Sequence, residues 1–314
     1  TTEIYTLSLH DALPIFNHAT FSSTQELITI PKGNFYYKWN FKTELVEEVN
    51  YHRILPEFYD NMQFSPNHDW IAGSINHYAY ILDSSTGALI HNVTISQTDS
   101  KNYVSFNHSG SRLLAISGNE DSPGIDNLIR IWRTDKWEVV RDIQGHTDSV
   151  WYAAFSPDDQ RIVSASLDGT AKVWNVENGT LVSEFVGHAT GVVYAEFLPD
   201  GQRVLSAGND RRAYICNTET ATVEQTIENI HLPVQLSPDG KYLFAGSEVW
   251  ELASGQVIKT LDGISQDYAN LTLSPDGTLL LTCEIGSESG GLTKLWNVQE
   301  HILGGSGIRE FERY

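Results

Sequence analysis

The sequence is poor in cysteine and methionine, with 2 Cys and 1 Met among its 314 residues. Cys216 and Cys283 can form one disulfide at most, so this is no small scaffold held together by disulfides, and the redox compartment stays open. Apolar runs are also short, and none approaches the roughly 18 residues that a membrane-spanning helix needs. We therefore expect no membrane insertion by this chain and a core built from its 40% hydrophobic residues.

Positive charge is scarce too. The chain carries 20 Lys and Arg against 40 Asp and Glu, which gives a formal net charge of -20. A surface of this sign has no basic patch that would release counterions from nucleic acid, and it repels anionic lipid headgroups. We therefore expect no nucleic-acid partner.

A repeat of about forty residues organises most of the chain. The clearest copies begin at Phe155 and Phe197, and each opens with a Pro-Asp turn whose proline stands two residues after the phenylalanine. Seven such units account for residues 16–301, so the two domains that length alone suggests are not needed. The units begin at Phe21, Phe64, Phe106, Phe155, Phe197, Leu236 and Leu273.

Within each unit the pattern is that of short β-strands. Stretches such as 161–166 and 171–174 are rich in Val, Ile and aromatic residues, and Pro-Asp-Gly, Asp-Gly or Asn-Gly turns separate them. Proline presets φ, while Asp and Gly accept the conformations that tight turns require. The pattern predicts four strands per unit, and no sustained 3.6-residue period predicts a helix.

The fourth unit resembles a WD repeat. It contains Gly145-His146, then Phe155-Ser156-Pro157-Asp158, Asp168-Gly169 and Val173-Trp174 at the spacing of that family. The resemblance implies an all-β, seven-bladed β-propeller of four-stranded blades over residues 16–301, followed by a tail, 302–314. The repeat's final Asp is Asn at four of the seven units: Asn40, Asn175, Asn217 and Asn297.

Residues 1–15, TTEIYTLSLHDALPI, resemble an in-frame translation of a widely used short-read sequencing adapter, codon for codon. We interpret them as an artefactual peptide, with a natural N-terminal strand as the alternative. The natural N-terminus is then missing from this sequence, so its compartment stays open. The alternation of residues 4–9 would still allow this peptide to act as a strand that closes the last blade.

The family resemblance implies a structural tetrad in the fourth unit, formed by His146, Ser166 (or Ser164), Asp168 and Trp174. The fifth unit keeps His188, Ser206 and Asp210, but Cys216 replaces the tryptophan, so we expect a truncated network. A His, a carboxylate and a hydroxyl also make up a hydrolase triad, but the resemblance favours the structural interpretation. The sequence has no paired ligand spacing for zinc and no phosphate-binding loop, so we expect no catalytic residues, no metal site and no cofactor.

The loops on one face of the propeller are the expected binding site. The resemblance places Trp151 beside the central channel, and an exposed Trp supplies a large contact area; the alternative is that it only packs on a neighbouring loop. Acidic insertions within 118–127 and 284–291 favour a basic or neutral protein or peptide as the partner of a monomeric propeller. The predicted partner-binding residues are Trp151, Leu167, Asn209, Arg211, Asp60 and Asn102.

Two other functions stay open at this point. The chain could be the propeller part of a longer signalling or membrane-anchored protein whose activity lies N-terminal of it. It could instead be a propeller enzyme with a metal or cofactor in the central channel. Asp60 is the only carboxylate among the expected channel-mouth positions, which disfavours the enzyme.

Overall fold

The described part of the chain is almost entirely β-strand in the computed structural model. Consecutive strands form antiparallel sheets in which each strand pairs with the next. No helix in this part is long and apolar enough to cross a membrane. The described residues are 4–7, 16–21, 26–31, 35–40, 45–50, 62–75, 77–96, 101–118, 127–261, 268–284, 293–299 and 310–311.

The predicted turns explain why the chain folds back at regular intervals. Between β14 (Val150–Phe155) and β15 (Arg161–Ser166), the Ser156 N–H donates to Arg161 O at 2.8 Å and the Asp159 N–H to Ser156 O at 2.9 Å. The Ser156 hydroxyl also donates to the Asp158 carboxylate. The Ser-Pro-Asp segment therefore closes a tight hairpin, as the sequence predicts.

The sheets have the four-stranded blades of a β-propeller, but the predicted set of seven such blades needs correction. Six sheets have four strands, and the remaining sheet has five, in the order β26-β27-β28-β1-β29. In that sheet β1 pairs antiparallel with β28, with Thr6 opposite Lys294, and β29 adds to β1 in parallel. Residues 4–7 thus form the strand that their alternation allowed, next to the last repeat.

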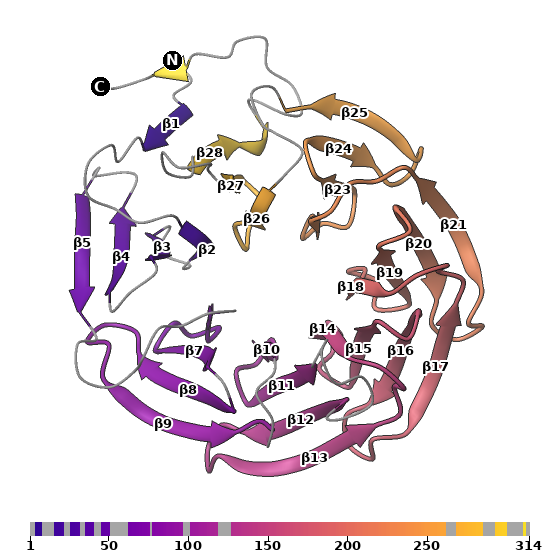
Figure 1. The fold of residues 1–314 in the computed structure, drawn as a ribbon, viewed down its shortest axis with the longest axis horizontal. Coiled ribbons are helices and arrows are strands. Elements are labelled where there is room, and N and C mark those ends of the chain that lie inside the picture. The colour runs from indigo at the N-terminus through magenta and orange to yellow at the C-terminus, as the bar shows by residue number, and fades with distance from the viewer. Residues whose placement is uncertain are drawn as a thin grey trace. The chain divides into compact units, whose positions relative to one another are not determined.

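Residues 59–230 form one compact unit. In Figure 1 its four blades follow one another side by side, with β10, β14 and β18 on the inner side and β13, β17 and β21 on the outer side. The blades are blade 2 with β6 (Met62–Phe64), β7 (Trp70–Ile75), β8 (Tyr78–Asp83) and β9 (Leu89–Thr94); blade 3 with β10 (Lys101–Phe106), β11 (Arg112–Gly118), β12 (Leu128–Arg133) and β13 (Glu138–Gln144); blade 4 with β14, β15, β16 (Thr170–Asn175) and β17 (Leu181–Val186); and blade 5 with β18 (Val192–Phe197), β19 (Arg203–Gly208), β20 (Arg212–Asn217) and β21 (Val223–Glu228).

Residues 1–58 and 231–314 form the second compact unit. It holds blade 1, blade 6 and the five-stranded sheet. Their strands are β2 (Phe16–Phe21), β3 (Glu26–Pro31), β4 (Phe35–Asn40) and β5 (Leu45–Asn50) in blade 1; β22 (Val234–Leu236), β23 (Tyr242–Ala245), β24 (Glu248–Glu251) and β25 (Gln256–Thr260) in blade 6; and β26 (Tyr268–Leu273), β27 (Leu279–Glu284), β28 (Thr293–Asn297), β1 (Ile4–Leu7) and β29 (Glu310–Phe311) in the five-stranded sheet.

The core lies between neighbouring blades. One apolar cluster joins Leu114 and Ile129 of blade 3 to Ile162 and Trp174 of blade 4, and all four are buried. A second joins blade 4 to blade 5 around Val173 and Val204. Blade 4 therefore buries both of its faces, one against blade 3 and one against blade 5, which leaves mainly its loops for contact with other molecules.

Candidate functional site

His146 links three parts of blade 4. It lies in the loop before β14, where Nδ1 is 2.8 Å from Asp168 Oδ2 and Nε2 is 2.7 Å from Ser164 Oγ. The Trp174 Nε1–H donates to the same hydroxyl at 2.8 Å. The His, Asp and Trp of the predicted tetrad thus meet, and they tie the loop to β15, the β15–β16 turn and β16.

The serine of this tetrad is Ser164, the alternative to Ser166 that the sequence left open. Ser164 lies opposite Lys172 in the middle of the sheet, within reach of both His146 and Trp174. Ser166 lies at the end of β15 and donates instead to Asp148 O at 2.9 Å. The two serines are two residues apart on one strand, so they share a face of the sheet but contact different groups.

The Asp168 carboxylate is strongly held. Burial works to raise its pKa, but hydrogen bonds from His146, Thr170 and the Thr147 N–H hold that pKa well below its usual range. The Asp–His–Ser order matches that of a hydrolase triad, yet Ser164 is 0% exposed and also accepts from Trp174. The hydroxyl is therefore buried, with its hydrogen-bond partners inside the blade, as a group in a structural network would be.

Blade 5 repeats the same network with one change. His188 Nδ1 lies 2.9 Å from Asp210 Oδ1, and its Nε2 lies 3.0 Å from Ser206 Oγ. Cys216 occupies the place of Trp174 and is buried, and burial raises the pKa of its thiol to about 12. Tyr214 partly replaces the missing indole, because its ring packs edge-on against His188 at 4.6 Å.

In blades 4 and 5 one further side chain supports this loop, and it is not among the residues predicted from the sequence. The Lys172 ammonium donates to Gly145 O at 2.8 Å, and at the matching position the Tyr214 hydroxyl donates to Gly187 O at 3.2 Å. Both residues occupy the same position in the third strand of their blade. The repeat alignment could have revealed it as a position that is polar in both blades.

Trp151 is the extra residue of a β-bulge. The pairing of β14 with β15 places Val150 opposite Ser166 and Tyr152 opposite Ala165, so the register shifts at Trp151. Val193 has the same place in β18. A bulge re-aims a side chain relative to its strand, and both side chains are half-buried.

Leu167 and Asn209 meet the same residue from two sides. The Leu167 side chain lies directly over Gly191, where an added Cβ would come within 2.6 Å of Leu167 Cδ2. The Asn209 N–H donates to Gly191 O at 2.9 Å. The Leu167 N–H in turn donates to Ser149 O, two residues before Trp151, so hydrogen bonds and packing link these loops to one another. We call the set Trp151, Leu167, Gly191, Val193, Asn209 and Arg211 the loop surface.

Arg211 is the exposed cation of the loop surface. It lies at the tip of the β19–β20 turn, where its N–H donates to Gly208 O at 3.1 Å. Its neighbour Arg212 pairs with Glu228 at 3.3 Å, whereas the described residues provide no ion pair for Arg211. A guanidinium in this position has its donors available for a ligand.

Of the two remaining predicted partner-binding residues, one lies on a regular strand and the other lies outside the described residues. Asn102 pairs opposite Ser117 in a regular part of β10, without the bulge that re-aims Trp151. Asp60 lies outside the described residues, as do most of the acidic insertions within 118–127 and 284–291. Among the described residues, no three His, Cys, Asp or Glu side chains come together as a metal site requires.

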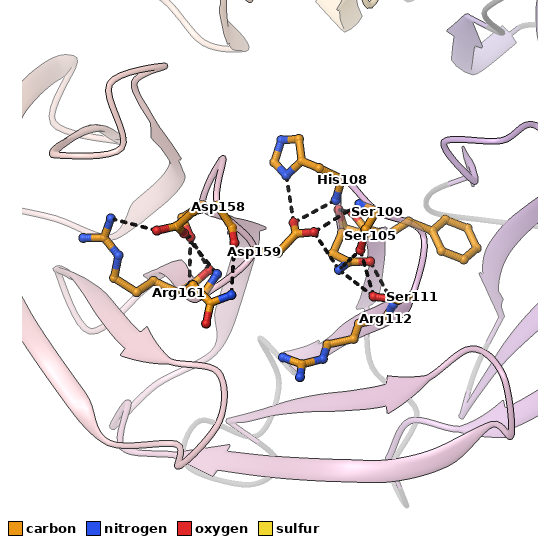
Figure 2. Close-up of polar contacts among 12 residues, drawn as sticks. Ser105, His108, Ser109, Ser111, Arg112, Asp158, Asp159 and Arg161 are labelled. Carbon is orange, nitrogen blue, oxygen red and sulfur yellow. Dashed lines mark hydrogen bonds and ion pairs between the residues drawn. The ribbon is translucent and has the colours of Figure 1, made fainter.

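A second set of polar contacts joins blades 3 and 4 through their first turns. Asp159 accepts from the His108 N–H and the Ser109 N–H at 2.9 and 3.1 Å, and from the Asn107 side chain at 2.9 Å. Figure 2 shows the carboxylate facing the His108 ring, whose Nδ1 is 3.0 Å from it. The signal in the sequence is a pair of departures: Asp159 stands where the turn usually has Gly, and His108 where it has Pro.

Three tyrosines also line up along the inner strands. The rings of Tyr103, Tyr152 and Tyr194 follow one another at 4.9 and 4.7 Å between centroids, one from each of β10, β14 and β18. The Tyr194 hydroxyl donates to Glu196, and burial raises the pKa of that carboxyl. The row packs neighbouring blades together on their inner side.

Comparison with protein families matches the central repeats. The description "WD domain, G-beta repeat" fits residues 137–175 and 179–217. These segments run from the turn before β13 to the end of β16, and from just before β17 to the end of β20. The chain therefore contains WD40 repeats, and each repeat supplies the outer strand of one blade and three strands of the next.

Proposed function

We propose that this β-propeller with WD40 repeats is a protein-interaction scaffold that binds a protein or peptide segment on the loop surface of blades 4 and 5. WD40 propellers are generally scaffolds without catalytic activity, and the buried serines Ser164 and Ser206 support a structural use of the triad-like clusters in blades 4 and 5.

The bulge at Trp151 is the observation that carries this proposal. It takes a large, half-buried aromatic side chain out of the regular strand pattern, and Val193 has the same place in the next blade. Asn209 and Arg211 are exposed, and Asn209 contacts Gly191, on which Leu167 packs. An aromatic anchor with a polar rim is the composition of a protein-binding hot spot. The net charge of -20 favours a partner that is neutral or basic overall.

Replacement of Trp151 tests the proposal. We expect Trp151→Ala to weaken recovery of bound proteins in a pull-down by about tenfold or more, because a central aromatic anchor carries much of an interface's binding energy. Val186→Ala is a matched control, since Val186 is 74% exposed but lies on the outer strand β17. A urea titration of both variants separates lost binding from lost folding. Equal recovery by wild type and both variants would contradict the proposal.

We also propose the domain assignment made from the repeats: an adapter-derived peptide, 1–15, one propeller domain over 16–301 and a tail, 302–314. The register of the repeats supports it, because the described sheets over 16–297 fall on the predicted units. Sequencing of the gene from an independent clone tests the assignment of residues 1–15.

A further inference from the structure

Arg211 occupies a turn position that is glycine in the neighbouring blade. Blade 4 has Asp168-Gly169-Thr170 and blade 5 has Asp210-Arg211-Arg212 after the same tetrad aspartate. Gly169 has φ 84° and Arg211 has φ 62°. A left-handed φ costs free energy for every residue except glycine. The backbone conformation at Arg211 therefore lowers the stability of blade 5, and it places a long cationic side chain at the tip of the turn.

Three other residues with this backbone conformation gain side-chain contacts within the fold. Asp159, φ 58°, accepts hydrogen bonds from the blade 3 turn (Figure 2). Trp137, φ 54°, stacks on His91 at 5.5 Å and packs against Trp70 at 5.6 Å. His68, φ 62°, has its ring 6.0 Å from that of Phe64. The Arg211 side chain has no hydrogen bond or ion pair among the described residues, so nothing there offsets its cost.

We propose that Arg211 binds a carboxylate of the partner segment, an Asp or Glu side chain close to the apolar residue that contacts Trp151 and Leu167. This inference rests on the proposed function. The link along the surface is short, because Leu167 lies on Gly191, Gly191 accepts from Asn209, and Arg211 follows two residues later. A guanidinium binds a carboxylate through two parallel hydrogen bonds.

The charge of the whole chain selects between anions. Phosphate chemistry could also satisfy Arg211, but a phosphorylated residue adds close to two negative charges, which a chain of net charge -20 repels. One carboxylate within a neutral or basic segment adds only one negative charge, and this charge lies next to the Arg211 guanidinium. The favoured ligand is therefore a single acidic side chain flanked by apolar and basic residues.

A displayed library of linear twelve-residue peptides tests this inference. Peptides selected on the wild-type protein are synthesised in three forms, with the acidic residue as Glu, as Gln and as phosphoserine, and their affinities are measured by fluorescence anisotropy. We expect Arg211→Gly to weaken the Glu peptide about tenfold, because the charge-assisted contact is lost. The Gln peptide should bind both proteins equally, and phosphoserine should bind wild type less well than Glu.

The stability of the variants gives a second, ligand-free readout. Arg211→Gly should unfold at the same or a higher urea concentration than wild type, because glycine relieves the strained φ and no internal contact is lost. Asp159→Gly, the matched control, should unfold at a lower concentration. A loss of stability in Arg211→Gly would overturn the inference by showing an internal role.

The outcomes separate the two proposals. If Trp151→Ala abolishes peptide binding but Arg211→Gly leaves Glu and Gln peptides unchanged, the carboxylate inference fails and the binding surface stands. Tighter binding of phosphoserine than of Glu would replace the carboxylate by a phosphate and overturn the inference as stated. If the library gives no peptide that depends on Trp151, the proposed function fails and the inference fails with it.

Discussion

The indole N–H shows how a single residue completes or breaks the repeated network. In blade 4 the Trp174 Nε1–H donates to Ser164, and in the five-stranded sheet the Trp296 Nε1–H donates to Thr282 at 3.1 Å. Blade 6 keeps the tryptophan, Trp250, but its buried Nε1 has no hydrogen-bond partner among the described residues. In each sheet the position that faces the indole N–H lies two residues after the residue opposite the tryptophan. This position is Ser164 in blade 4 and Thr282 in the five-stranded sheet, but it is Ala245 in blade 6.

Ala245→Ser should therefore stabilise the protein. The serine hydroxyl would accept from Trp250 Nε1, and satisfying a buried donor is worth about 1 kcal/mol. The measurement is the free energy of unfolding in urea. Ala253→Ser, in an exposed turn of the same blade, is the control and should change little. A destabilised Ala245→Ser would show that the hydroxyl does not reach the indole.

The sequence predicted most of these residues but not their partners. The resemblance to a WD repeat implies His146, Asp168 and Trp174, and they do meet. The sequence does not distinguish Ser164 from Ser166, because both serines lie on the same face of β15. Only the structure shows which of them is close enough to His146 and Trp174. The bulge at Trp151 likewise arises from pairing with β15, which no local pattern of β14 records.

At the scale of elements, the first turns of blades 3 and 4 both depart from the common turn sequence, and His108 and Asp159, one departure from each turn, contact each other. Gly110 and Gly201, which hold the Asp159 position in blades 3 and 5, have φ 71° and 65°. An added Cβ on Gly110 or Gly201 would lie near a proline of the preceding turn, Pro66 or Pro157. Blade 3 has His108 instead of that proline, and thus an extra N–H, which the Asp159 carboxylate accepts. The two departures compensate each other across the blade boundary.

Asp159→Gly should destabilise the protein by about 1–2 kcal/mol near neutral pH, because the lost hydrogen bonds outweigh the relief of the strained φ. Burial works to raise the Asp159 pKa, but hydrogen bonds from His108 and Ser109 leave that pKa lowered. A lowered folded pKa gives stability that is present above the unfolded value of about 3.9 and is lost as pH falls through the folded value.

Urea titrations between pH 6 and pH 2.5 check this expectation. The difference between wild type and Asp159→Gly should be constant above pH 5 and shrink below pH 4. Asp135→Asn, an exposed residue paired with Arg133, controls for general acid effects. A difference that grows as the pH falls would contradict the role of the ionised carboxylate.

For the whole molecule, acidity is the dominant long-range property. The net charge of -20 makes the folded chain repel itself, because folding brings the excess carboxylates closer together. Ion pairs such as Arg130–Asp142, 2.7 Å, offset this only locally. A neutral partner is not repelled by this charge, and a basic partner is attracted to the protein.

Salt should therefore stabilise the protein. Raising NaCl from low to moderate concentration shortens the screening length to about 10 Å near 0.1 M and weakens the repulsion. We expect the thermal midpoint to rise by a few degrees in a differential scanning measurement. KCl should give the same curve, since screening does not depend on the cation. A midpoint that falls steadily with salt would show that surface ion pairs outweigh the repulsion.

The sequence predicts the fold more completely than it predicts which residues form the loop surface. Turn residues at fixed intervals and short apolar strands predict four-stranded antiparallel sheets, and six of them form as predicted. The fifth strand of the remaining sheet arises because β29 pairs with β1. That contact joins residues from opposite ends of the chain, and no repeat pattern specifies it.

The offset between repeat and blade has a consequence for how such genes change length. Trp137 and Gly179 hold the same place in the turns before β13 and β17, so removal of residues 138–179 would join β12 directly to β17. The resulting sheet would still have four strands, with β17 outermost in place of β13. Recombination at these turns thus removes or duplicates one repeat while every hairpin stays intact, so propeller genes can gain and lose units without passing through a broken sheet.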